Sequence, residues 1–166
     1  LSNYGGIKMN AIRDDQLMLL TYLRLNAREK LTNISRKTGI PISTLFERLK
    51  EFKGKIIKKN VALLDFQMLG YSIKAHISLK IKREDRYKLL DYLDRNGSVN
   101  SVYRINNGYD ILIEAIFRDI KEAEMFIDNI EDNFTIKAKN MYYIIEEIKK
   151  EEFFSNLENL KIVNQK

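Results

Sequence analysis

The sequence predicts an α+β protein, with a helical domain at residues 11–65 and an α/β domain at residues 71–166. Three observations predict this class. Apolar residues recur at helical spacing three times in the first part, and they alternate at strand spacing over residues 71–82. The patterns that follow have the order helix, strand, strand, helix, strand. Residues 66–70 lack a clear period and end in Gly, which predicts a linker between the domains.

The first part contains three short helices. We expect them over residues 14–25, 31–37 and 43–53, where apolar side chains recur every three or four positions. Gly39 ends the second helix, because Gly readily adopts the left-handed conformation found at helix C-termini. The third helix begins within a few residues, so the two helices and their tight turn form a helix-turn-helix.

A small wing hairpin is expected after the third helix. Residues 56–64 contain two short β-rich stretches around Lys58, Lys59 and Asn60, which is the pattern of two strands and a turn. The basic tip suits contact with phosphates. The first part therefore predicts a winged helix-turn-helix.

The second part predicts a ferredoxin-like βαββαβ domain. The expected strands are residues 71–82, 99–105, 111–117 and 134–145, and the first helix is residues 83–96. Asn107-Gly108 separates the central strands and favours a tight hairpin, because both residues tolerate positive φ. Asp119 is placed to cap the second helix. Both helices of such a split βαβ domain cover one face of the sheet.

The opposite face of the sheet also receives apolar residues in this prediction. They are Val102, Leu112, Ile116, Met141, Tyr143 and Ile145. Burial of apolar surface is favourable by about 25 cal/mol per Å², so we expect a second copy of the chain to cover this face. The tail after Glu146 carries Ile148, Phe153, Leu157 and Leu160 at helical spacing, which predicts a C-terminal helix packed on the homodimer.

The positive charge of the chain is confined to the first part. Residues 1–65 contain 13 Lys and Arg against 6 Asp and Glu, whereas residues 66–166 contain 16 against 17. A genome rich in Lys codons would explain the abundance of Lys but not this asymmetry. The asymmetry indicates a surface for the phosphates of double-stranded DNA.

Composition excludes several other classes. No apolar run approaches the roughly 20 residues of a membrane span. The N-terminus lacks a secretory pattern and the chain has no Cys, so we expect a cytoplasmic protein without disulfides or Cys-based zinc sites. His76 is the only His and is expected at the surface, so no metal site follows. Without a nucleophile and base in a constellation, or a Gly-rich phosphate loop, we expect no enzyme and no cofactor.

The outer face of the third helix is the expected reader of bases. The candidates for base contacts are Ser43, Thr44, Glu47 and Lys50. The candidates for phosphate contacts share a flexible positive charge and are Arg36, Lys37, Arg48, Lys53, Lys55, Lys58 and Lys59. The alternative for each is solvated surface, and Arg48 has a second alternative as the ion-pair partner of Asp14, Asp15 or another acid. Phe46 is expected to pack rather than to contact DNA.

Two stretches resemble the Lrp/AsnC, or feast/famine, family of regulators. The first is GIPISTLFERLKEF followed by KIIKKNVALLDFQMLGY, which is similar to the family's recognition helix, wing and approach to its sensor domain. The second is NNGYDILIEA, which resembles a hairpin of the family's effector domain. Residues in register with the family pattern include Arg48, Ile56, Ile57, Lys58, Ala62, Leu64, Asp65, Leu69 and Gly70. The resemblance covers nearly the whole chain.

This resemblance implies a DNA-binding transcriptional regulator that forms dimers and assembles further to tetramers or octamers. It also implies an amino-acid effector at Asn107, Gly108, Tyr109 and Asp110, for which an ordinary Asn-Gly hairpin is the structural alternative. The sequence departs from the family pattern in three places. Pro41 replaces Ser at the start of the recognition helix, so Thr44 and Glu47 offer a later capping box. Lys55 and Asn107 each replace a Gly.

Two other functions share this fold. Some proteins that resemble the family are decarboxylases of haem synthesis, and a protein-binding or amino-acid-binding sensor that has lost DNA contact is the other alternative. The hairpin around Asn107 lacks His, which argues against the enzyme. The basic wing argues against a sensor without DNA binding.

Overall fold

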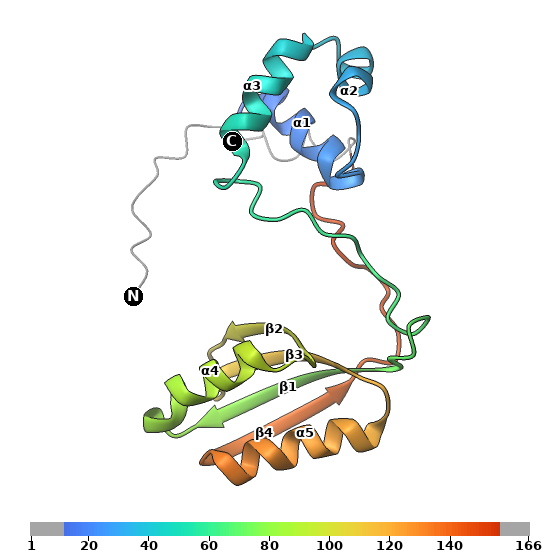
Figure 1. The fold of residues 1–166 in the computed structure, drawn as a ribbon. Coiled ribbons are helices and arrows are strands. Elements are labelled where there is room, and N and C mark those ends of the chain that lie inside the picture. The colour runs from blue at the N-terminus through green and yellow to red at the C-terminus, as the bar shows by residue number, and fades with distance from the viewer. Residues whose placement is uncertain (1–11, 157–166) are drawn as a thin grey trace. The chain divides into compact units, whose positions relative to one another are not determined.

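The computed structural model describes residues 12–156, which divide into two compact units (Figure 1). Within the described range, the first unit comprises residues 12–62 and 148–156, and the second runs from Leu63 to Glu147. Each unit has its own hydrophobic core. No helix among residues 12–156 is long and apolar enough to cross a membrane.

Three helices form the first unit, as the sequence predicted. They are α1 (Asp14–Leu25), α2 (Leu31–Thr38) and α3 (Ile42–Phe52). Their shared core consists of Leu19, Ile34, Leu45 and Phe52, all nearly inaccessible to solvent. Because α3 contributes Leu45 and Phe52 to this core, its inward stripe is fixed and the opposite face is left to solvent.

The turn between α2 and α3 is held by short-range hydrogen bonds. Gly39 adopts φ of +74° and donates its N–H to Ser35 O at 2.8 Å. The Ser35 hydroxyl donates to Ile40 O at 2.6 Å, so Ser35 holds the turn through both its backbone and its side chain. Pro41 occupies the N-cap position of α3 without a side-chain cap hydrogen bond, and the helix begins at Ile42, so the alternative later start at Thr44 is not used.

The expected wing hairpin over residues 56–64 is wrong. Phe52 O accepts the backbone N–H groups of Lys55, Ile56 and Ile57, so the chain turns tightly at once after α3. The one β-bridge here is parallel, between Lys53 and Ile57, and no strand follows in residues 58–65. An isolated two-stranded ribbon is marginally stable, and the segment's apolar side chains after Ile57 are exposed rather than buried.

The described part of the tail is not helical, so the expected C-terminal helix is wrong for residues 146–156. Leu157 and Leu160, which were expected on that helix, lie outside the described residues. Arg24 of α1 holds the tail through its guanidinium, which donates to Glu151 O at 2.6 Å and to Phe153 O at 3.1 Å. The same guanidinium pairs with the Glu151 carboxylate at 2.8 Å, so the tail packs with the first unit.

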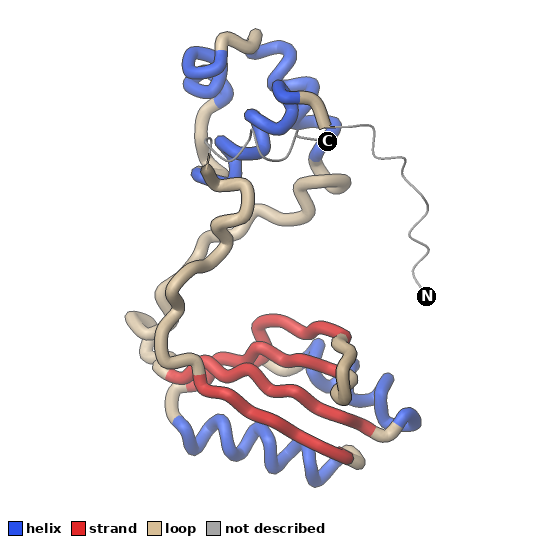
Figure 2. Tube along the Cα trace, turned by 180° about the vertical axis from the view of Figure 1, so that it is seen from behind, coloured by secondary structure: helices blue, strands red, loops and turns tan. Residues whose placement is uncertain are grey.

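The second unit has the expected ferredoxin-like order. Its strands are β1 (Ile73–Ile81), β2 (Val99–Arg104), β3 (Ile111–Phe117) and β4 (Ile136–Tyr143), arranged as β2-β3-β1-β4 with antiparallel neighbours. Its helices are the short 3₁₀ turn η1 (Arg83–Asp85), α4 (Arg86–Arg95) and α5 (Ile120–Asn133). Both α4 and α5 lie on one side of the sheet, and Figure 2 shows its other face.

The core of this unit follows from strand alternation. Ala75, Ile77, Leu79 and Ile81 of β1 are all buried, as the sequence predicted. They pack with the buried residues of β3 and with one stripe of each helix. Asp119 caps α5 by accepting the Glu122 N–H at 2.8 Å, which confirms the expected cap.

Three residues expected on the open face lie on the helix side instead. Val102 pairs with Ile113 and Met141 with Ile77, and both side chains pack against the core. Tyr143 reaches Glu124 of α5 with its hydroxyl at 2.9 Å. The strand register decides which face these side chains occupy, because a shift of one residue moves a side chain to the other face. In β2 such an irregularity lies between Val99 and Ser101.

Candidate nucleic-acid interface and effector hairpin

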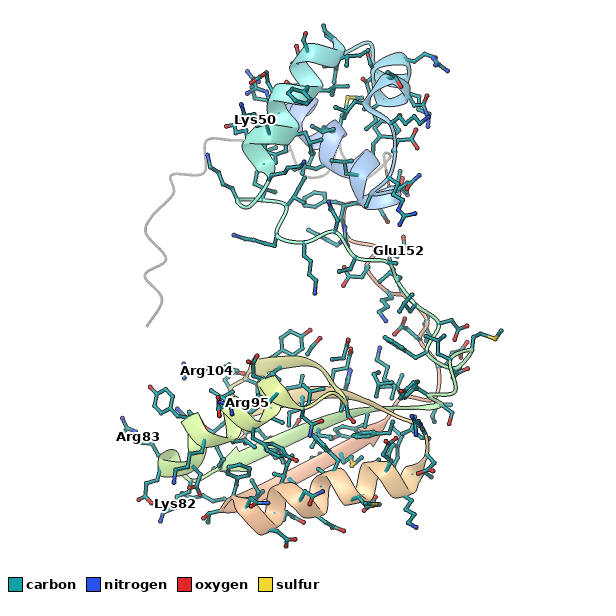
Figure 3. The ribbon with its side chains drawn as sticks, in the orientation of Figure 1. Lys50, Lys82, Arg83, Arg95, Arg104 and Glu152 are labelled. Carbon is teal, nitrogen blue, oxygen red and sulfur yellow. The ribbon has the colours of Figure 1, made fainter. Side chains whose placement is uncertain are left out.

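The outward face of α3 presents polar and apolar side chains together. Ser43, Phe46, Glu47 and Lys50 are exposed, and Thr44 is half-buried. Lys50 projects from the side of α3 away from α1 and α2 (Figure 3). Neither Glu47 nor Lys50 forms an ion pair with any residue of the described range 12–156. Their charged groups are therefore available to a partner.

Most of the expected phosphate contacts are also available. Arg36, Lys53, Lys55 and Lys59 are exposed and form no ion pair within the described part of the chain. Lys58 makes one long contact, 3.5 Å from its Nζ to Gly54 O. These side chains come from the end of α2 and from the loop after α3, so positive charge flanks the outward face of α3.

Lys37 and Arg48 have internal partners. Lys37 Nζ lies 3.4 Å from Glu29 and 5.4 Å from the centre of the Tyr22 ring. Arg48 pairs with Glu51 at 3.2 Å and approaches Asp15 of α1 to 3.8 Å, with its side chain only 28% exposed. Arg48 thus links α3 to α1, which is the ion-pair alternative left open by the sequence.

On α3, the exposure of Phe46 differs from the prediction. Phe46 was expected to pack, yet 57% of it is exposed, and Ile42 one turn earlier is 48% exposed. The core stripe of α3 is filled by Leu45, Leu49 and Phe52, so it has no place for Phe46. At 100° per residue, position 46 lies outside the face formed by Leu45, Leu49 and Phe52, so helical periodicity could have predicted that Phe46 is exposed.

The hairpin between β2 and β3 is wider than a two-residue turn. Asn107 has φ of +62° and Gly108 of +95°, as the Asn-Gly pattern predicted. The loop closes where Ile105 N–H donates to Asp110 O at 3.1 Å, which leaves four residues between them. Asn107 and Gly108 are exposed, and Tyr109 is half-buried.

Asp110 is held by the fold rather than presented to solvent. One carboxylate oxygen accepts the Ile81 N–H at 3.1 Å, and the other pairs with Arg86 of α4 at 2.8 Å. Its backbone N–H donates to Leu79 O at 2.9 Å. Asp110 therefore positions the hairpin against the end of β1 and the start of α4.

A polar cluster occupies the open face of the sheet, and the sequence reading missed it. Glu114 of β3 accepts a hydrogen bond from Asn100, lies 3.1 Å from His76 Nε2 and pairs with Lys74 at 3.4 Å. Lys74 also pairs with Glu147 at 2.6 Å. The pairing of His76 with Glu114 across β1 and β3 brings these groups together, so only the strand register could have revealed them.

The cluster shifts the pKa values of its members. Partial burial opposes the charged form of Glu114, but hydrogen bonds from Asn100 and His76 and the charge of Lys74 outweigh it, so the pKa of Glu114 is lowered. Desolvation likewise opposes the charge of Lys74, but its hydrogen bond to Glu147 and the Glu114 carboxylate raise its pKa. Among residues 12–156, no group of three His, Asp or Glu side chains could hold a metal ion.

Comparison with known proteins agrees with this architecture. The sequence profile of the Lrp/AsnC ligand binding domain matches residues 74–152, which include the sheet, both of its helices and the hairpin. The HTH-type transcriptional regulator FL11 of Pyrococcus furiosus is 28% identical over 124 residues, which cover 74% of this chain and 82% of the relative. FL11 of Pyrococcus horikoshii is 28% identical over 113 residues, covering 68% and 75%. The chain is therefore similar to HTH-type transcriptional regulators, and its second unit resembles the Lrp/AsnC ligand binding domain.

Solved structures of transcriptional regulators share this fold. The transcriptional regulator NMB0573 of Neisseria meningitidis, solved in complex with L-Met, superposes with a TM-score of 0.78 at 20% identity, covering 83% of this chain and 92% of that one. AsnC of E. coli superposes with a TM-score of 0.75 at 21% identity, covering 84% and 95%. The resemblance drawn from the two sequence motifs is confirmed.

Replacing Asp110 with Asn tests whether this residue is structural. The change leaves Arg86 without its counter-charge and weakens the bond to Ile81 N–H, so we expect the free energy of unfolding to fall by about 1–3 kcal/mol. Asp91→Asn is the matched control, because Asp91 pairs with Arg95 on an exposed surface and its loss costs about 0.5 kcal/mol or less. Urea denaturation of both variants measures the difference, and equal losses would contradict the structural role.

Replacing Glu114 with Gln tests the polar cluster through pH. Because the folded-state pKa of Glu114 is lowered, its stabilisation is present above the ordinary value near 4.5 and is lost as the pH falls through the lowered pKa. We expect the variant to be less stable at pH 7 and the difference from wild type to shrink below about pH 4.5. Glu84→Gln, at an exposed pair with Lys82, serves as the control. Thermal melts from pH 3 to pH 8 that show a constant difference would contradict this assignment.

Proposed function

We propose that this regulator binds duplex DNA by placing α3 in the major groove. The observation that carries the proposal is the outward face of α3, where Glu47 and Lys50 have no ion-pair partner among the described residues. The second helix of a helix-turn-helix reads base edges from such a face. Ser43, Thr44, Glu47 and Lys50 supply donors and acceptors suited to those edges.

Phosphates of the same duplex are bound by the flanking cations. Arg36, Lys53, Lys55, Lys58 and Lys59 are exposed around α3, and the first 65 residues carry the excess of positive charge. Lys37 and Arg48 are less available because they pair internally, and Arg48 contributes by holding α3 against α1. Phosphate contacts of this kind orient a protein on DNA without reading its sequence.

The active form in this proposal is a homodimer that buries the open face of the sheet. Leu112 lies on that face with Tyr103 and Tyr142, which are 52% and 57% exposed, while Ile116 on the same face is already buried. Covering these apolar side chains is favourable, and the charges of Glu114 and Lys74 on the same face are already paired with each other. A two-fold protein requires a two-fold operator. Further assembly to tetramers or octamers is consistent with this arrangement, since a dimer leaves both helical faces free.

An amino acid or a related metabolite is the proposed effector, bound at the hairpin of residues 106–109. The exposed amide of Asn107 and the free backbone of Gly108 offer polar groups to a zwitterion, and Asp110 positions them. The complex of the relative NMB0573 with L-Met supports this class of ligand. The effector would act by binding one assembly or DNA-bound state more tightly than another.

DNA binding is tested by selecting sequences from a random duplex library with the full chain. We expect an inverted repeat with half-sites about one helical turn, or a multiple of it, apart. The double variant Lys58→Glu/Lys59→Glu should weaken binding to all sequences alike and reduce the salt slope by about 2 to 4 for the dimer. Lys121→Glu/Lys137→Glu, an equal charge change in the second unit, should leave the slope unchanged. If the full chain retained no duplex above background, DNA binding would be refuted. If the Lys58→Glu/Lys59→Glu variant kept the wild-type salt slope, the proposed phosphate contacts would be refuted.

The effector is tested by a thermal-shift screen of the twenty amino acids on the full chain. At least one should raise the melting temperature and change either oligomeric state or DNA affinity. Asn107→Gly is the informative variant, because Gly tolerates the positive φ of this position and only the amide is lost. A hit whose shift survives Asn107→Gly unchanged would place the effector away from this hairpin.

A further inference from the structure

Ile42, Phe46 and Lys50 form one row along α3. Residues four apart lie one above the other on a helix, so the three side chains follow one line on its surface. Ile42 and Phe46 are 48% and 57% exposed, and Lys50 is exposed as well. The core is filled by the other stripe of α3, so this row contributes little to folding.

The charge around this row restricts what can cover it. Residues 31–59 contain eight Lys and Arg against two Asp and Glu, and one of the two acids, Glu51, is paired with Arg48. A second copy of this surface would be repelled by like charge. The suitable partner is anionic as a whole but presents apolar groups at the centre of the contact.

Duplex DNA has this combination in its major groove. Its phosphates carry the negative charge, and each thymine exposes a C5-methyl group on the groove floor. Phe and other apolar side chains contact that methyl group, which distinguishes an A·T pair from the other pairs. Ile42 and Phe46 occupy the first two turns of α3, and the N-terminal residues of a recognition helix are those that reach base edges.

We propose that Phe46, with Ile42 beside it, contacts thymine C5-methyl groups and thereby selects A·T pairs at defined positions of the operator. The inference rests on the proposed function and adds a specificity determinant to it. Lys50, one turn beyond Phe46, then lies over the next base pairs, where Lys donates to the O6 and N7 atoms of guanine. The row therefore reads thymine first and guanine next along the groove.

The test replaces each thymine of the selected operator with deoxyuridine, one position at a time. This change removes only the methyl group and leaves every hydrogen-bonding group in place. We expect about fourfold weaker binding of the wild-type chain at one or two positions in each half-site, the value for one buried methyl-sized group. Affinities are measured by fluorescence anisotropy at a fixed salt concentration.

Substitutions at position 46 connect the methyl effect to the side chain. The Phe46→Ala variant should bind thymine and deoxyuridine duplexes with equal affinity. That affinity should be no higher than the affinity of the wild-type chain for the deoxyuridine duplex. Phe46→Leu should restore part of the preference. Tyr87→Ala is the control, because Tyr87 is an aromatic residue of α4 that is 84% exposed, and its loss should leave the fourfold ratio intact. Circular dichroism checks that the variants, all at exposed positions, remain folded.

Three results would overturn the inference while leaving DNA binding in place. The first is equal affinity of the wild-type chain for thymine and deoxyuridine at every position, and the second is a ratio that persists in Phe46→Ala. A change of sedimentation coefficient in Phe46→Ala without any change in the methyl ratio would also overturn it, in favour of contact between copies. Failure to retain any duplex would instead refute the proposed function itself.

Discussion

The antiparallel pairing of β1 with β3 is the constraint on which the second unit depends. It opposes Ile77 to Ile113 and His76 to Glu114, so one face of the sheet becomes core and the other becomes a polar cluster. The same register ends beside Asp110, which then reaches Ile81 and Arg86. A shift of one residue would bury the charges and expose the apolar stripe, and the loss of burial makes that arrangement unfavourable.

A comparable constraint acts in the first unit through α3. The helix must bury Leu45 and Phe52 against α1 and α2, which fixes its rotation about its own axis. The residues left outside, including Phe46 and Lys50, then form the surface proposed to read DNA. The turn at Gly39 adds to this, because a left-handed residue there ends α2 and lets α3 begin almost immediately.

The two units are connected by more than one segment of the chain. The segment after α3 leads into the second unit, and the tail after β4 returns to the first, where Arg24 holds it at Glu151 and Phe153. The tail was expected as a helix on the sheet domain because its apolar residues have helical spacing. Short amphipathic segments gain most of their helicity from packing, so spacing alone could not determine what this tail does.

The sequence by itself determined the helices of the first unit, the βαββαβ order of the second and the conformation of Asn107-Gly108, because these follow from local periodicity and backbone preference. It also located the positive charge, which needs only counting. Tertiary structure alone decided which face Met141 and Val102 occupy and that Asp110 is tied to Arg86. Each of these depends on a partner distant in sequence, and the free energy of that contact outweighs the local pattern.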